Sequence, residues 1–196
     1  MNGTKKIGIL ALQGAFAEHI VSLHKLGVEA LPIRLASELE NLDGLVIPGG
    51  ESTTIGKLMM LYGFIEALKR LSKEGFPIFG TCAGMILLAK TILDSNVEAI
   101  STMDIKVMRN AFGRQVDSFE TLLPIPVLGE QAFPAVFIRA PIIVEAGPRV
   151  EILAWLPDGT PVAARQGNLL AAAFHPELTS DLRFHAYFLD IVSRGG

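Results

Sequence analysis

Short apolar runs alternate with helical patterns through the first half of the chain, and this alternation limits the possible folds more than any other feature. The apolar runs cover residues 6–12, 28–33, 44–47 and 77–80, and the helical patterns cover 15–26, 52–61, 64–73 and 83–92. Unbroken apolar runs are typical of strands buried on both faces of a parallel sheet. The pattern predicts a three-layer α/β fold of the flavodoxin-like kind, with a mostly parallel sheet and helices on both faces.

The second half of the chain has a different pattern. Short strand candidates separated by turn residues lie at 105–108, 121–126, 135–138, 142–144, 151–155, 161–165 and 169–174, and a helical pattern at 181–193 closes the chain. These strands favour antiparallel additions to the sheet. No linker or repeat interrupts the 196 residues, so we expect one domain over residues 1–196.

Composition excludes several classes of protein. The net charge of −3 and the absence of a basic run argue against nucleic-acid binding. A single cysteine cannot form an internal disulfide, and no spacing typical of a zinc site is present. No apolar run approaches the roughly 18 residues that a membrane-spanning helix needs.

Residues 5–17 imitate a secretory signal, with two lysines, a short apolar run and an A-x-A sequence. The apolar run is interrupted by Gln13 after only a few residues. A buried strand followed by a helix explains the same sequence, so we expect a cytoplasmic protein.

The sequence G-T-C-A-G at residues 80–84 falls between a predicted strand and a predicted helix. It has the form of a nucleophile elbow, in which small residues two positions before and after the nucleophile allow a sharp turn. Cys82 would then lie at a helix N-terminus, which favours a thiolate. A buried, inert cysteine in a tight turn is the alternative.

His175 and Glu177 follow the last predicted strand in the sequence H-P-E. If the extended conformation continues through Pro176, the two side chains point to the same side. The carboxylate can then orient the imidazole while the other ring nitrogen takes a proton from a thiol. Alone, this sequence is more typical of a polar turn; together with the elbow it suggests a Cys-His-Glu triad.

The loop P-G-G-E-S-T-T at residues 48–54 follows the third predicted strand. Its adjacent glycines allow a close backbone approach to a ligand, and Ser52 or Thr53 could cap the next helix. A phosphate-binding P-loop does not fit, because Glu51 and Leu58 occupy positions that need glycine and Ser/Thr. A substrate-binding or oxyanion loop fits better.

Two further segments, at residues 109–115 and 137–141, place arginines beside strand-like residues. Arg109 or Arg139 could bind a carboxylate in a bidentate manner, although surface arginines explain the spacing equally well. His19, His24 and His185 lie in helical patterns, and we interpret them as surface or packing residues.

The elbow and the distant H-P-E resemble the class I (triad) glutamine amidotransferases. More narrowly, six segments in one order resemble the glutaminase subunits of pyridoxal 5′-phosphate synthases; they are residues 11–14 with 18–19, 48–54, 80–85, 109–115 with 118–120, 137–141, and 174–178. They span nearly the whole chain.

The resemblance implies a role for each matching residue. Cys82 would be the nucleophile, with His175 and Glu177 as its relay. Glutamine would be bound by Gly50, Glu51, Ser52, Arg109, Ile138 and Arg139. The oxyanion hole would be formed by Gly49, Gly50 and Ala83, and Gln13 would be a secondary residue near the oxyanion loop and the partner surface.

The resemblance also implies hydrolysis of L-glutamine to glutamate and ammonia, with no cofactor. Ammonia would pass to a synthase subunit, a separate (β/α)8 barrel, which makes pyridoxal 5′-phosphate from a pentose phosphate and a triose phosphate. Activity would be weak without that subunit. The alternatives are a glutaminase subunit of another amidotransferase and a non-catalytic module that uses Cys82 as an oxidation sensor.

Overall fold

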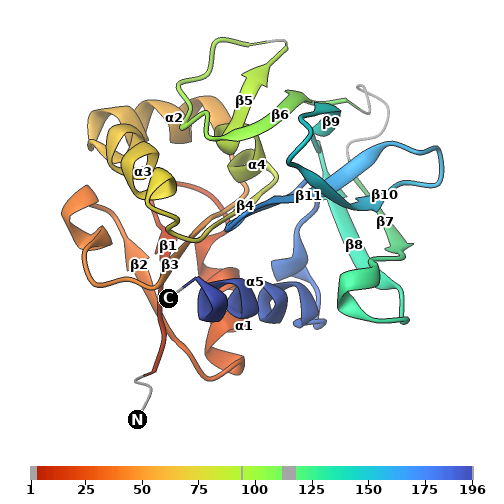
Figure 1. The fold of residues 1–196 in the computed structure, drawn as a ribbon, viewed down its shortest axis with the longest axis horizontal. Coiled ribbons are helices and arrows are strands. Elements are labelled where there is room, and N and C mark those ends of the chain that lie inside the picture. The colour runs from red at the N-terminus through yellow and green to blue at the C-terminus, as the bar shows by residue number, and fades with distance from the viewer. Residues whose placement is uncertain (1–3, 94, 112–117, 196) are drawn as a thin grey trace.

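Seven strands form a central sheet in the computed structural model, which describes residues 4–93, 95–111 and 118–195. Their order is β10-β11-β12-β4-β3-β1-β2. The strands are β1 (Lys6–Leu10), β2 (Glu29–Ile33), β3 (Gly44–Ile47), β4 (Ile78–Thr81), β10 (Glu151–Trp155), β11 (Pro161–Gln166) and β12 (Leu169–Ala172). Figure 1 shows the sheet crossing the middle of the molecule.

The parallel part of this sheet comprises β2, β1, β3, β4 and β12. With β12 as the fifth strand, this is the flavodoxin-like order 2-1-3-4-5. Every residue of β3, β4 and β12 is buried, because helices cover both faces. The predicted fold class is therefore confirmed, and the signal-like segment at residues 5–17 contains β1, the loop after it and the first two residues of α1.

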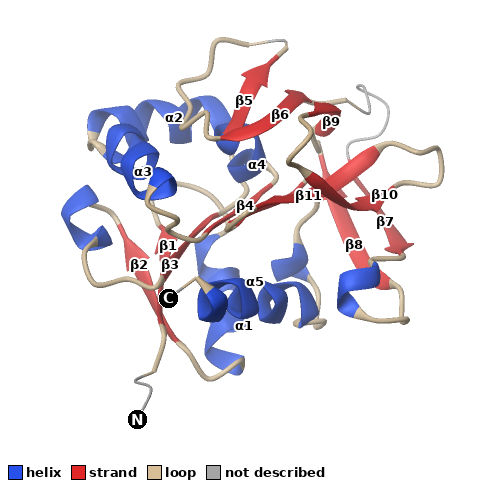
Figure 2. Cartoon of the chain, in the orientation of Figure 1, coloured by secondary structure: helices blue, strands red, loops and turns tan. Residues whose placement is uncertain are grey.

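Helices lie on both faces of the sheet (Figure 2). One face carries α1 (Phe16–Lys25) and α5 (Arg183–Arg194), and the other carries α2 (Ser52–Leu61), α3 (Phe64–Lys73) and α4 (Ala83–Leu88). Beneath α5, the Phe79 ring of β4 packs against Phe184 and Phe188, each with its centroid 5.5 Å away. Among the described residues, we find no helix with the length and apolar character needed to cross a membrane.

The strands of the second half do not all join the central sheet. Within the described residues, β12 joins it in parallel beside β4, and β10 and β11 extend it with antiparallel pairing. The others form two small sheets, one of β5 (Ala89–Ile92), β6 (Met103–Met108) and β9 (Ile142–Ala146), the other of β7 (Ser118–Leu123) and β8 (Phe133–Ile138). The antiparallel additions are thus confirmed for the central sheet, while the separate sheets were not predicted.

The predicted helix over residues 83–92 is wrong in its second part. Helix α4 ends at Leu88, Ala89 adopts an extended backbone, and residues 89–92 pair with β6 in parallel. Apolar residues at 85–89 and 92 fit a helical pattern equally well, so only the tertiary pairing with β6 decides the boundary.

We expect Phe188→Ala to lower the free energy of unfolding by about 3–5 kcal/mol, because the ring is fully buried against Phe79. Leu61→Ala is the matched control; its side chain is 72% exposed on α2, and its cost should stay below about 0.5 kcal/mol. Urea denaturation measures both. Equal costs for the two variants would contradict this account of the core.

Candidate active site

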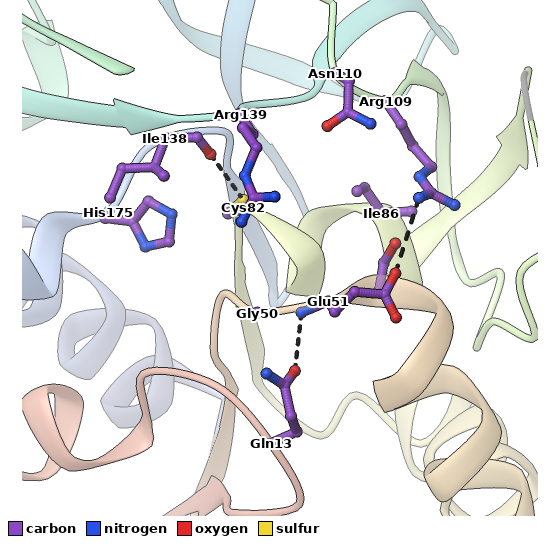
Figure 3. Close-up of a pocket in the computed structure, with 11 residues that line it drawn as sticks. Gln13, Gly50, Glu51, Cys82, Ile86, Arg109, Asn110, Ile138, Arg139 and His175 are labelled. Carbon is purple, nitrogen blue, oxygen red and sulfur yellow. Dashed lines mark hydrogen bonds and ion pairs between the residues drawn. The ribbon is translucent and has the colours of Figure 1, made fainter. Parts of the chain in front are cut away.

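The candidate site lies where the parallel strands of the central sheet end. Gln13 follows β1, the loop at residues 48–51 follows β3, Cys82 follows β4, and His175 lies shortly after β12. In open α/β sheets, ligands bind at the carboxyl ends of the strands. The structure therefore brings together segments that are up to 162 residues apart in the sequence, from Gln13 to His175 (Figure 3).

Cys82 has a strained backbone, with φ 49° and ψ −102°. It separates β4 from α4, and its amide donates a hydrogen bond to the Ala172 carbonyl of β12 at 2.7 Å. A Cβ added at Gly84 would lie 2.1 Å from the Ile47 carbonyl oxygen, and one at Gly80 would lie 2.5 Å from the Gly84 backbone. The glycines are thus needed for the close packing of α4 on β3 and β4, as in a nucleophile elbow.

His175 and Glu177 meet in a way that differs from the predicted extended geometry. Pro176–Leu178 form a 3-10 helix, so the chain turns after His175. The ring nitrogen Nδ1 of His175 nevertheless lies 2.7 Å from Oε1 of Glu177, and both side chains are buried. The predicted pairing therefore occurs, although through a turn, because proline at the first helical position favours the 3-10 helix.

The electrostatics of this pair favour charge separation. Burial alone would lower the pKa of His175, but hydrogen bonds to Cys82 and Glu177 outweigh it and raise that pKa to about 10. Burial alone would raise the pKa of the Glu177 carboxyl, but the neighbouring His19 and His175 hold it below its usual range. The arrangement stabilises an imidazolium beside the Glu177 carboxylate, while Sγ of Cys82 lies 3.9 Å from the Ile138 carbonyl oxygen (Figure 3).

The loop after β3 is held by its own polar groups. Glu51, rather than Ser52 or Thr53, caps α2, since its carboxylate accepts hydrogen bonds from the Thr53 and Thr54 amides. The Glu51 amide donates to Oε1 of Gln13 at 2.8 Å, which ties this loop to the one after β1. These contacts fix the backbone of residues 49–51 beside the elbow.

The peptide between Gly49 and Gly50 has a defined orientation. The Gly49 carbonyl accepts a hydrogen bond from the Ala15 amide at 3.0 Å. A trans peptide directs its N–H opposite to its carbonyl, so the Gly50 amide points away from that contact.

A cavity of about 290 Å³ opens above these residues; its lining is Gln13, Gly50, Glu51, Ser52, Cys82, Ile86, Arg109, Asn110, Ile138, Arg139 and His175. Its size lies at the lower end of small-molecule sites (roughly 300–1,000 Å³), which suits a ligand as small as an amino acid. Of the sequence-predicted site residues, Gly49, Ala83 and Glu177 lie outside this lining.

Two lining residues, Ile86 and Asn110, were not predicted. Asn110 has a positive φ of 46°, as do Cys82 at 49° and Arg139 at 42°. Such conformations cluster at functional sites, and asparagine tolerates them better than most residues do. The sequence signal that could have identified Asn110 is its position directly after Arg109. Residues 112–115 of the same predicted segment lie outside the described residues.

Arg109 lines the cavity, and its side chain contacts both the beginning of α2 and Ser95. Its guanidinium donates to the Ser95 hydroxyl at 2.8 Å and to the Thr53 hydroxyl at 3.3 Å, and lies 3.9 Å from the Glu51 carboxylate. The cavity therefore carries charges of both signs. No cluster of three or more His, Cys, Asp or Glu within residues 4–93, 95–111 and 118–195 could hold a metal ion.

We expect Gly84→Ala to cost about 3 kcal/mol or more in the free energy of unfolding, because the new methyl group meets the backbone of β3. Gly63→Ala is the control. Gly63, unlike Gly84, has a positive φ of 75°, but its added Cβ would meet nothing closer than 4.0 Å, so its cost should be about 1–2 kcal/mol, from backbone strain alone. Thermal unfolding compares the two, and a smaller cost at Gly84 would contradict the packing described here.

We expect Glu51→Ala to lower stability by about 1 kcal/mol at neutral pH, the usual cost of losing a helix cap. The folded-state pKa of Glu51 is lowered to about 2 from 4.5, chiefly by the Thr54 hydroxyl. The stabilisation is therefore complete above about pH 4.5 and disappears as the pH falls toward 2. Chemical denaturation at several pH values tests this, with Glu66→Ala, at an 83% exposed side chain, as control.

Comparisons with known proteins agree on one family. Residues 9–194 match the SNO glutamine amidotransferase family. The chain is 59% identical to the pyridoxal 5′-phosphate synthase subunit PdxT of Moorella thermoacetica, over 95% of this chain and 99% of the relative. It is 60% identical to the PdxT of Herpetosiphon aurantiacus, over 94% and 99%.

Solved structures agree with this result. A crystal structure described as that of a glutamine amidotransferase superposes on this chain with a TM-score of 0.91. The two are 48% identical in sequence, and the match covers 95% of this chain and 98% of the other. A putative GMP synthase subunit from Thermoplasma acidophilum, at 18% identity and a TM-score of 0.70, shares the fold. On the strength of the sequence match and the high identity to these relatives, the chain belongs to the SNO glutamine amidotransferase family.

Proposed function

We propose that this chain is the glutaminase subunit of a pyridoxal 5′-phosphate synthase and hydrolyses L-glutamine with Cys82, His175 and Glu177. The observation that carries the proposal is the elbow cysteine at the base of a small cavity, beside a histidine whose Nδ1 lies 2.7 Å from a buried carboxylate. An oxidation sensor needs no base aligned in this way. Family membership and the names of the relatives support the same function.

The chemistry begins at the Cys82 sulfur. The thiolate attacks the side-chain amide carbon of glutamine, and the carbonyl electrons move to the oxygen. Since Nδ1 of His175 is engaged by Glu177, Nε2 delivers its proton to the leaving nitrogen, and ammonia departs. The neutral imidazole then takes a proton from water, whose oxygen attacks the thioester. The C–S bond breaks, glutamate leaves, and the thiolate–imidazolium pair is restored.

Substrate binding is assigned to the cavity lining. Gly50, Glu51, Ser52, Arg109, Ile138 and Arg139 all line it and would hold glutamine. A guanidinium of Arg109 or Arg139 suits the α-carboxylate of an amino acid, and the Glu51 carboxylate suits its α-ammonium group. The amides of Gly50 and Ala83, with Gly49 in the same loop, would hold the oxyanion. Gln13 would support this loop through its contact with Glu51.

The proposal includes a partner. Ammonia is useful only where a second active site consumes it, and the relatives are named as subunits of a synthase. We therefore propose that the chain, as one class I glutamine amidotransferase domain over residues 1–196, delivers ammonia to a synthase subunit in the cytoplasm. No cofactor enters the steps above. The central position of β1 supports the cytoplasmic setting, because removing residues 5–17 as a signal would remove an inner strand of the sheet.

We expect Cys82→Ala to lower glutamate release from glutamine by at least about a thousandfold, as is usual when a triad nucleophile is lost. The assay uses the full chain together with its synthase subunit, and thermal unfolding checks that the variant is folded. Unchanged glutamate release in the variant would overturn the role of Cys82. Absence of glutamate release by the unaltered complex would overturn the function itself.

A further inference from the structure

Two buried histidines lie behind Glu177, on the side away from the cavity. Nε2 of His19 lies 3.3 Å from Oε2 of Glu177 and 3.2 Å from the Thr81 hydroxyl. Nδ1 of His19 lies 2.9 Å from Nε2 of His185. Both histidines are fully buried, between β4 and the helices α1 and α5, whereas His24 of α1 is exposed. Neither lines the cavity, and the proposed reaction does not use them.

The surroundings keep both imidazoles neutral. The Phe79 ring lies edge-on to His19 and His185, at centroid distances of 6.2 and 6.0 Å. Burial lowers the pKa of His19, against the opposing charges of Glu177 and of Glu18 on its own helix, while His175 adds to the lowering. Burial and the neighbouring His19 lower the pKa of His185 to about 3, against the charge of Glu177.

Neutral imidazoles carry one hydrogen each, so only one hydrogen lies between Nδ1 of His19 and Nε2 of His185. If it belongs to His19, then the Nε2 lone pair of His19 faces the Glu177 carboxylate. The His185 hydrogen must then sit on Nδ1, which is buried and has no hydrogen-bond partner. In this arrangement, the Nε2 lone pair of His19 repels the Glu177 carboxylate, and the Nδ1–H of His185 is buried without an acceptor.

If the hydrogen belongs to His185, both difficulties disappear. His19 then carries its hydrogen on Nε2, facing the Glu177 carboxylate and the Thr81 hydroxyl. His185 is left with an unpaired acceptor at Nδ1, which is less costly to bury than an unpaired N–H. The geometry therefore selects the Nε2–H form of both histidines.

We infer that His19 is a positioning residue for the triad: its Nε2–H, donated to Thr81, places a partial positive charge 3.3 Å from the second oxygen of Glu177, and His185 fixes the tautomer that makes this possible. The inference rests on the proposed function, and it extends the Cys82–His175–Glu177 relay to two further side chains. Oε2 of Glu177 is buried and accepts no hydrogen bond, so a polar N–H at 3.3 Å offsets part of the cost of burying its charge, while that N–H itself donates to the Thr81 hydroxyl. With His175 hydrogen-bonded to one oxygen and His19 close to the other, the carboxylate presents Oε1 to His175 in a fixed direction.

This role makes a specific kinetic prediction. In His19→Leu, Glu177 loses the nearby partial positive charge of the Nε2–H in a buried place, so its affinity for protons increases and the carboxylate needed by His175 is lost at a higher pH. We expect kcat to fall by about tenfold or more, the scale of losing a polar contact to a charged group, with little change in KM. The acid limb of the kcat/KM profile should move up by about one pH unit.

Two matched variants separate positioning from packing. His19→Gln keeps a nitrogen donor near the position of Nε2 and should restore most of kcat and the acid limb. His24→Gln removes an exposed histidine from the same helix and should leave both unchanged. Glutamate release is measured with the synthase subunit present. A His19→Leu variant with the kcat and pH profile of the unaltered chain would overturn the inference, as would a His19→Gln variant as impaired as His19→Leu.

A direct measurement needs no turnover. Long-range ¹H–¹⁵N spectra of the ¹⁵N-histidine-labelled full chain report the tautomer of each imidazole, and single substitutions assign the four histidines. We expect neutral Nε2–H forms at His19 and His185 from pH 6 to pH 8. An Nδ1–H form or an imidazolium at His19 would overturn the inference, even if His19→Leu fails to fold. If the unaltered complex releases no glutamate while the tautomers are as expected, the proposed function fails and the His19–Glu177 contact stands.

Discussion

The close packing of α4 on β3 and β4 is the constraint on which the site depends. Because Gly84 lies against the Ile47 carbonyl and Gly80 against Gly84, the chain can reverse direction within a single residue, and that residue is Cys82. The reversal forces a positive φ on Cys82 and places it at the carboxyl edge of the sheet. Gln13, the loop after β3 and His175 are positioned relative to this edge by the strands of the parallel sheet, whose buried register allows little movement. Arg109 and Ile138 reach the site from the two small sheets, after β6 and at the end of β8.

The second constraint is a buried negative charge. Glu177 is almost fully buried, and a carboxylate in such a place must be paired. His175 approaches one oxygen and His19 lies near the other, so the charge is shared between the face that meets the substrate and the face that packs on α1. The same contacts that stabilise the carboxylate also orient the imidazole toward Cys82. Stability and chemistry thus depend on one cluster of side chains.

Sequence patterns predicted the parallel half of the fold because each strand there is buried on both faces and each helix has an apolar stripe. They failed where apolar residues fit two structures, as at residues 89–92, which pair with β6 instead of continuing α4. They also failed where local polar chemistry had several solutions. Glu51 caps α2, although Ser52 and Thr53 are residue types that cap helices well. A 3-10 turn joins His175 to Glu177, although an extended chain would also place the two side chains on the same side.

The sequence by itself determined the layered α/β fold, the elbow around Cys82 and the H-P-E segment, because glycine spacing and apolar periodicity act over short stretches of chain. Only the tertiary structure decided what lies beside them. His19 and His185 are 166 residues apart and look like ordinary helix residues, yet they meet behind Glu177. Asn110 and Ile86 join the cavity in the same way. Such contacts follow from the packing of helices on a sheet, and no short-range pattern records them.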